Sequence, residues 1–200
     1  TIYVTLGSLI FSLILSIPLA MIKITKNKIL NFIGFLYTDI FRALPSLVQI
    51  YLVYFAAPQL FGITFTAMTS AFITLSMNAA AYISEALRGG ILSVDIGQRE
   101  AAKALGISQV DTLKDIVLPQ ALKAVFPSMI NETIGLLKGT SLVSIIGVVD
   151  LMRASRQVMA DSYLSFEPLM VAAVIYYILV KSMSMIGNRL EKRIRVSEIR

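Results

Sequence analysis

Charged and amide side chains interrupt the long apolar runs of this chain at a few positions, and these residues could bind a polar ligand. Asn78, Glu85 and Arg88 fall seven and then three residues apart, so on a helix they share one face. A guanidinium such as that of Arg88 can hold a carboxylate through two parallel hydrogen bonds. The structural alternative is that Arg88 pairs with Glu85 one turn earlier, or extends toward the interface with water.

A second polar set lies in the apolar run 116–149. Asn131, Gly135 and Lys138 share a face of the expected helix, whereas Glu132 is rotated by about 100 degrees from Asn131. For Glu132 and Lys138, a structural ion pair and the lining of a pathway both stay open. Ser141 is also a pathway candidate, although hydroxyls at such positions more often support helix packing.

The residue inventory argues against an enzyme. The chain has no cysteine and no histidine, which removes disulfides, thiol nucleophiles and the commonest general base. It also has no G-x-x-x-x-G-K-[ST] sequence to hold a nucleotide triphosphate and no hydrolase motif. We therefore expect no catalytic residue, no metal site and no cofactor on this chain, and any energy source must be another chain.

The composition is that of an integral membrane protein. Of 200 residues, 56% are hydrophobic and 15% are charged, and the mean hydropathy is +0.78. A soluble domain has about a quarter charged residues. The net charge of +6 does not indicate nucleic-acid binding, because the basic residues cluster between apolar runs, as the positive-inside rule describes.

Span length divides the chain into five transmembrane helices of one all-α domain, 1–200, since a span needs about 20 residues. The expected spans are 1–22, 37–56, 65–89, 116–149 and 168–188. The fourth exceeds the bilayer thickness, so we expect it to kink at Pro119 or Pro127. An N-terminus outside and a C-terminus in the cytoplasm place Lys23, Lys26 and Lys28, the block 99–123 and the basic tail on the cytoplasmic side.

The charged insert 93–115 separates the third and fourth spans. It predicts two short helices around Gly106, the first capped by Asp95 and the second opened by a capping box of Ser108 and Asp111. A solvated loop would explain its charge. The small apolar surface of Ala101, Ala102 and Leu105, however, favours insertion into a groove of another protein.

The insert also carries a family resemblance. Its Glu-Ala-Ala, Gly and Ile-x-Leu-Pro spacing resembles the signature of permease subunits of binding-protein-dependent ABC importers, here Glu100, Ala101, Ala102, Gly106, Ile116, Leu118 and Pro119. The segments "FRALPSLVQIYLVYF" and "LLKGTSLVSIIGVVDLMR" are similar to the polar amino-acid uptake subfamily. The resemblance covers nearly the whole chain. One departure is Ala43-Leu44 before Pro45, where the subfamily usually has Gly-Thr.

The resemblance implies a concrete assembly in the bacterial cytoplasmic membrane. Glu100, Ala101, Ala102, Leu105 and Gly106 would belong to a coupling helix that docks on one of two cytoplasmic ATPase subunits, which bind ATP and magnesium. A second permease subunit, identical or related, would complete the pathway, and an extracytoplasmic binding protein would deliver a polar or charged amino acid. Which amino acid, and which charges face the pathway, stays open.

Two other classes of membrane protein fit the sequence less well. An ion channel or secondary transporter would more naturally show matched internal repeats, and the sequence shows no such symmetry. A scaffold that only anchors a soluble partner would not need Asn78, Glu85, Arg88, Glu132 and Lys138 at membrane depth, where each unpaired polar group costs a few kcal/mol.

Overall fold

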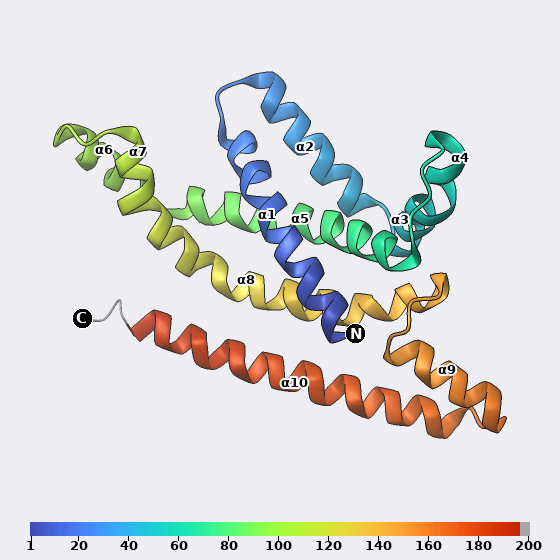
Figure 1. Cartoon of the computed structure of the whole chain (residues 1–200). Helices are drawn as coiled ribbons and strands as arrows, with labels where there is room; N and C mark the ends of the chain where they lie inside the picture. Colours follow the sequence, from blue (N-terminus) through green and yellow to red (C-terminus); the bar gives the residue numbers. More distant parts are fainter. Residues whose placement is uncertain (197–200) are drawn as a thin grey trace.

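The structure, a computed structural model that describes residues 1–196, is all-helical in that part of the chain (Figure 1). The N-terminal half contains α1 (Ile2–Ile24), α2 (Lys28–Ala43), α3 (Ser46–Tyr51), the π-helical turn η1 (Leu52–Ala56), α4 (Ala57–Phe61) and α5 (Ala67–Ser93). The C-terminal half contains α6 (Ile96–Ala104), α7 (Gln109–Asp111), the π-helical stretch η2 (Thr112–Val117), α8 (Leu118–Gly139), the 3-10 stretch η3 (Thr140–Ile146), α9 (Leu151–Ser162) and α10 (Phe166–Val196).

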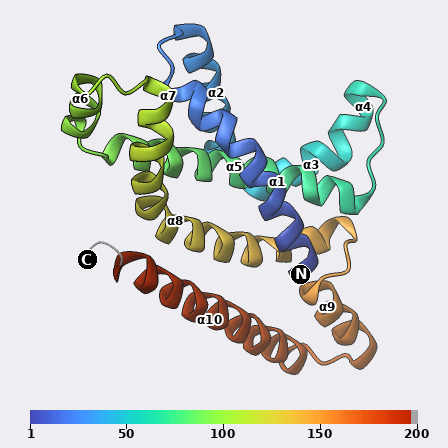
Figure 2. The same cartoon turned by 60° about the vertical axis from the view of Figure 1, so that its left-hand side comes forward.

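The helices pack around α5. Helix α1 runs along one side of α5, α8 packs on another, and α10 lies against α8 at the edge of the molecule. In Figures 1 and 2 the short helices α6 and α7 and the C-terminal end of α10 lie at one end of the molecule, and α4 and α9 lie at the other. We call these the α6 end and the α9 end.

Small side chains let α1 approach α5 closely. The buried face of α1 carries small residues one helical turn apart, namely Thr5, Ser8, Ser12, Ser16 and Ala20. Ser12 and Ser16 donate their hydroxyls to carbonyls of the preceding turn, those of Leu9 and Leu13. Helix pairs in membranes associate through such small residues, because lipid offers no hydrophobic driving force between helices.

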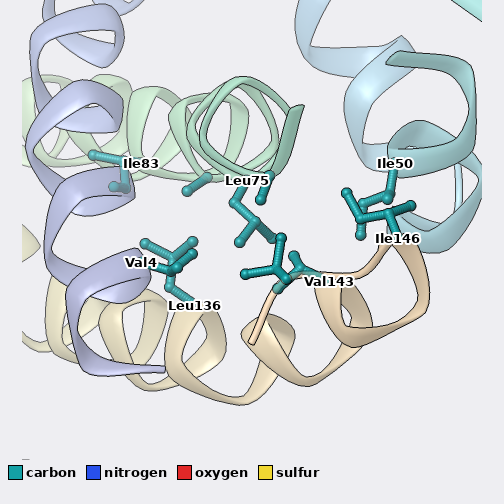
Figure 3. Packing of buried hydrophobic residues seen from close by; sticks show 10 residues of the cluster. Val4, Ile50, Leu75, Ile83, Leu136, Val143 and Ile146 are labelled. Atoms are coloured by element: carbon teal, nitrogen blue, oxygen red, sulfur yellow. The ribbon is translucent and has the colours of Figure 1, made fainter. Parts of the chain in front are cut away.

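The largest apolar cluster lies where α1, α3, α5, α8 and η3 meet. Val4, Ile50, Leu75, Val143 and Ile146 belong to this cluster, and each is at most about a twentieth exposed. Figure 3 shows their side chains meeting between the helices. The cluster joins the N-terminus of the chain to the segment that follows α8.

The helix expected at 37–56 is interrupted, which corrects the sequence prediction. Helix α2 begins earlier, at Lys28, and ends at Ala43, and α2 and the following α3–α4 segment bend by 105°. Proline lacks an amide hydrogen and disfavours helical backbone in the residue before it. Leu44, directly before Pro45, accordingly has an extended backbone with ψ of 135°.

The insert 93–115 contains the two short helices predicted. Asp95 accepts a hydrogen bond from the Gly97 amide, and Ser108 accepts one from the Asp111 amide. Gly106 has a φ of +73°, the left-handed conformation expected for it. The second helix does not stop at the insert, because α7 continues through η2 into α8.

The two prolines at which the fourth span was expected to kink, Pro119 and Pro127, lie in different surroundings in the structure. The π-helical stretch η2 ends at Val117, two residues before Pro119, whereas Pro127 lies inside α8, which continues unbroken to Gly139. The 3-10 stretch η3 then ends at Ile146, before the expected limit of 149. Pro119 has no amide hydrogen, so it cannot donate the regular helical hydrogen bond, and the wider π-helical turn lies where this bond is missing.

By length and hydropathy, two helices in the described part of the chain qualify as membrane spans, α1 and α10, or up to four if each of two bent helix pairs counts as one span. Helix α5 carries Glu85 and Arg88 in its second half and does not qualify. The basic tail predicted for 189–200 is helical to Val196, and 197–200 lie outside the described residues.

Candidate functional site

The break between α2 and α3 is stabilised by two side-chain amides. Because Pro45 cannot donate, the Phe41 carbonyl lacks its helical partner. Gln49 fills this role, since its Nε2 donates to the Phe41 oxygen and to the Leu44 oxygen, each at 2.8 Å. Asn78 on α5 adds a bond to the Phe41 oxygen and one to Gln49 Oε1, each at 3.2 Å. The predicted pathway residue Asn78 thus supports the break.

A cavity of about 200 Å³ opens beside this break, between α3, α5 and α8. Its polar lining consists of Ser46, Asn78, Tyr82 and Glu132, and Gly135 and Gly139 leave room on the α8 side. The structure therefore brings together two predicted pathway residues, Asn78 and Glu132. Glu132 lines this cavity, whereas Asn131, the residue before it on α8, does not.

A second cavity, of about 400 Å³, lies between α2 and α5. It is lined by Phe35, Thr38, Asp39, Arg42, Ala43, Tyr82 and Glu85. Tyr82 lines both cavities, and the guanidinium carbon of Arg42 lies 5.2 Å from the centroid of its ring. Arg42 forms no ion pair within the described part of the chain.

Next to the second cavity, a buried charged cluster joins α1, α2 and α5. The Lys23 ammonium, whose side chain is 0% exposed, donates to Thr38 Oγ1 at 2.7 Å, to Ser84 Oγ at 2.8 Å and to Glu85 Oε1 at 2.7 Å. An ammonium has three donors, so all of them are used. The second oxygen of Glu85 accepts from Arg88 Nη2 at 3.1 Å and from its Nε at 3.2 Å.

This cluster bears on two predictions. Arg88 makes the pair with Glu85 that was the structural alternative to holding a carboxylate, and its guanidinium also lies 5.5 Å from the Phe35 ring centroid. Lys23 was expected in a cytoplasmic loop with Lys26 and Lys28. It belongs instead to α1, because the small-residue face of that helix continues to position 23 and points it at Glu85.

On the other face of α8, the predicted residues Asn131 and Lys138 do not line these cavities. Asn131, Gly135 and Lys138 are exposed along one side of the helix, although Gly135 also borders the smaller cavity. Neither Glu132 nor Lys138 forms an ion pair in the described part of the chain, so the structural pair considered for them is absent there. Ser141 donates its hydroxyl to the Lys138 carbonyl at 2.8 Å, a bond within the helix.

The insert residues lie at the α6 end, far along the molecule from α9 (Figure 1). Ala102 is buried, whereas Glu100, Ala101, Leu105 and Gly106 are exposed. Leu105 is 79% exposed and Val110 is 72% exposed. Both are apolar side chains exposed within a charged segment.

Arg42, Tyr82, Gln49 and Lys23 were not among the residues selected from the sequence. The signal for Gln49 is Pro45 itself, because a proline inside an expected helix breaks it. Such a break leaves carbonyls that nearby polar side chains must satisfy. The signal for Lys23 is its spacing from Ser16 and Ala20, which places it on the buried face of α1.

Comparisons with known proteins agree with this architecture. Residues 8–196 match the family described as binding-protein-dependent transport system inner membrane component. The "Putative glutamine transport system permease protein GlnP" of Rickettsia bellii is 45% identical over 190 residues, which is 95% of this chain and 87% of the relative. The arginine transport system permease protein ArtQ of Bacillus subtilis is 40% identical over 198 residues, 99% of this chain and 90% of the relative.

Solved structures resemble it as well. A crystal structure of an amino acid ABC transporter with histidines superposes with a TM-score of 0.90 at 32% identity, covering 96% of this chain and 89% of that one. The MetNI methionine ABC transporter, at 20% identity and a TM-score of 0.83 over 96% of this chain and 92% of that one, shares the fold. The chain belongs to the family of binding-protein-dependent transport system inner membrane components.

Proposed function

We propose that this chain is the transmembrane subunit of an ATP-driven importer of a polar or charged amino acid. Relatives at 45% and 40% identity are named for glutamine and arginine transport, and a structural neighbour at 32% identity is an amino acid ABC transporter. The observation that carries the proposal is the arrangement around Tyr82, where a guanidinium and a carboxylate line two adjoining cavities.

An amino acid presents a carboxylate and an ammonium group a few ångströms apart. Arg42, which has no ion-pair partner in the described part of the chain, offers a guanidinium to the carboxylate. Glu132, half-buried in the smaller cavity, offers a carboxylate to the ammonium. Tyr82 separates the two groups, and Asn78 and Ser46 add polar contacts. The side chain of a bound glutamine or arginine would extend along this polar lining.

The membrane arrangement we propose keeps five spans with the N-terminus outside. Bent pairs such as α2 with α3–α4 count as one span each, and α5 completes the set despite its charges, which are paired internally. The turn between α1 and α2, with Lys26 and Lys28, then shares the cytoplasmic side with α6 and the end of α10. The basic residues of these segments follow the positive-inside rule.

In this arrangement α6 is the coupling helix. Two ATPase subunits bind ATP and magnesium, and their closure moves α5 and α8, which flank the insert, so that the pathway alternates between inward and outward access. A second permease subunit, identical or related, faces the exposed side of α8 that carries Asn131, Gly135 and Lys138. An extracytoplasmic binding protein delivers the amino acid at the α9 end.

The test is uptake by the complex reconstituted in vesicles with its ATPase and binding protein. We expect Arg42→Gln and Glu132→Gln each to raise the amino acid concentration needed for half-maximal uptake by roughly tenfold or more, because each removes one charge-assisted contact. Lys26→Gln, which removes an exposed charge in the α1–α2 turn, is the matched control and should transport normally. Unchanged uptake in both cavity variants would refute this binding site.

A further inference from the structure

A third cavity, of about 370 Å³, lies between α6 and the start of the α7–η2–α8 helix. Two cations, Arg99 and Lys103, line it together with Gln109 and Thr112, and Ile107, Leu113 and Val117 form its apolar wall. We call it the α6 cavity. It lies at the α6 end, away from Tyr82, and no residue of the two proposed substrate cavities belongs to it.

The Arg99 guanidinium is held in place but incompletely satisfied. Its Nη2 donates to the Ile91 carbonyl oxygen at 2.6 Å, which fixes the side chain against the end of α5. Its Nε is buried and has no hydrogen-bond partner. A buried donor without a partner costs more than a typical hydrogen bond contributes. Arg99 therefore keeps a donor that no group in the described part of the chain accepts.

No acid of the described chain compensates the two cations. Neither Arg99 nor Lys103 forms an ion pair in the described part of the chain. Two acids of the insert are engaged elsewhere, since Asp95 caps α6 and Asp111 bonds to Ser108. No acid of the insert lines the α6 cavity, and the remaining two, Glu100 and Asp115, are exposed. The cavity therefore has an unbalanced positive charge.

We infer that the α6 cavity accepts an aspartate or glutamate side chain of the cytoplasmic ATPase, an inference that rests on the proposed function. A carboxylate matches a guanidinium in shape and charge and satisfies its open N–H groups. The exposed apolar residues Leu105 and Val110 belong to the same insert and supply contact area around the charged contact. The acidic side chain fixes the orientation of α6 on the ATPase.

The experiment measures the affinity of purified ATPase for the full-length permease in nanodiscs. Arg99→Gln should weaken binding by roughly thirtyfold, because it removes one partner of a desolvated charge pair. Lys114→Gln, an exposed cation of the same insert that does not line the cavity, should bind as the original protein does. Binding of Arg99→Gln equal to that of Lys114→Gln would overturn the inference.

Charge reversal separates a specific contact from loss of folding. Arg99→Glu should bind weakly until one exposed acid of the ATPase is changed to arginine, and this pair should regain binding. If no such reversal in a scan of the exposed ATPase acids restores it, the inference fails. Lys103→Gln, which removes the other cation of the cavity, should weaken ATPase binding less than Arg99→Gln does. Thermal unfolding of each variant permease alone verifies that the variant is folded.

Two further outcomes are informative. If inorganic phosphate raises the unfolding temperature of the permease alone, and Arg99→Gln abolishes that effect, the cavity binds a free anion and the ATPase contact is refuted. If the unaltered chain transports no amino acid with any cognate ATPase, the proposed function fails. Normal transport with unaffected binding of Arg99→Gln refutes only the inference.

Discussion

Lys23 illustrates how a charge can be stabilised inside a membrane protein. Its ammonium reaches two hydroxyls and a carboxylate, and the carboxylate is shared with Arg88. An ion removed from water must recover its solvation through such partners. The cluster joins three helices at the half of α5 that leads to α6. It therefore holds α1 and α2 against the helix that connects to the insert.

We expect Lys23→Met to destabilise the chain by about 3–5 kcal/mol, since removal of one partner leaves a buried charge uncompensated. The double variant Lys23→Met with Glu85→Gln should recover part of this loss, because it also removes the carboxylate charge that Lys23 had paired. Thermal unfolding in detergent measures both. Lys26→Met, at an exposed position, is the control, and an equal loss there would contradict the burial argument.

At the scale of single residues, the sequence predicted contacts within one helix better than contacts between helices. The spacing of Glu85 and Arg88 predicted their pair, and the structure contains it. The third member, Lys23, comes from α1 across the bundle, and its sequence context, followed closely by Lys26 and Lys28, resembles a loop. Asn78 was selected for its depth, and its bonds to Phe41 and Gln49 follow from a helix break that was not foreseen.

At the scale of elements, local signals were reliable where capping and glycine chemistry determine the structure. Asp95, Gly106 and Ser108 define α6 and α7 as expected. Division by length was less reliable, because 43–84 is free of charge and the length that a span needs does not show where the helix expected at 37–56 breaks. Pro45 is the signal for this break, because α2 ends shortly before it and the following α3–α4 segment is bent by 105° from α2.

The two amides at this break should contribute unequally to stability. Gln49→Ala removes the donor to both the Phe41 and Leu44 oxygens, whereas Asn78→Ala leaves Gln49 in place. We expect Gln49→Ala to cost about 1–3 kcal/mol of unfolding free energy and Asn78→Ala to cost less. Gln59→Ala, at an exposed position on α4, should be neutral. The reverse order would show that the break does not depend on Gln49.

Adjacent glycines of α5 test the crossing with α8. A Cβ at Gly90 would lie 2.9 Å from the Ala121 carbonyl oxygen and collide with the Val125 side chain, whereas a Cβ at Gly89 meets nothing within 4 Å. Both substitutions by alanine gain helix propensity, about 1 kcal/mol in a helix interior. We expect Gly90→Ala to be less stable than Gly89→Ala by about 1–3 kcal/mol, the cost of overpacking.

The comparison of these two variants isolates the clash, because backbone entropy changes equally in both. It is measured as the difference between their unfolding midpoints in one detergent. The coupling of transport to ATP hydrolysis in the complex gives a second measurement, since α5 and α8 both lead into the insert. Equal stability of the two alanine variants would mean that the helices separate readily at Gly90, and the close crossing would then be unimportant.

At the scale of the whole molecule, the chain leaves two kinds of exposed surface. Helix α10 exposes apolar residues, with Ile186 58% and Val171 59% exposed, which suits contact with lipid acyl chains. Helix α8 instead exposes Asn131, Gly135 and Lys138 along one side. Polar residues at membrane depth face water or protein rather than lipid. This difference was visible in the sequence, but the direction in which each face points required the packing of α5 and α10 on α8.

The absence of cysteine from the chain makes this surface directly testable, because each single-cysteine variant carries one thiol. We expect Asn131→Cys and Lys138→Cys to react with a charged, membrane-impermeant thiol reagent in the assembled complex. Ile186→Cys and Val171→Cys should stay unreactive until detergent is added, since a charged reagent does not enter hydrocarbon. In the proposed alternating-access cycle, reaction rates at 131 and 138 should also differ between nucleotide-free and ATP-bound complexes, because the side that admits water would change. Equal reactivity of the α8 and α10 positions would place Asn131 and Lys138 against lipid and remove them from the pathway.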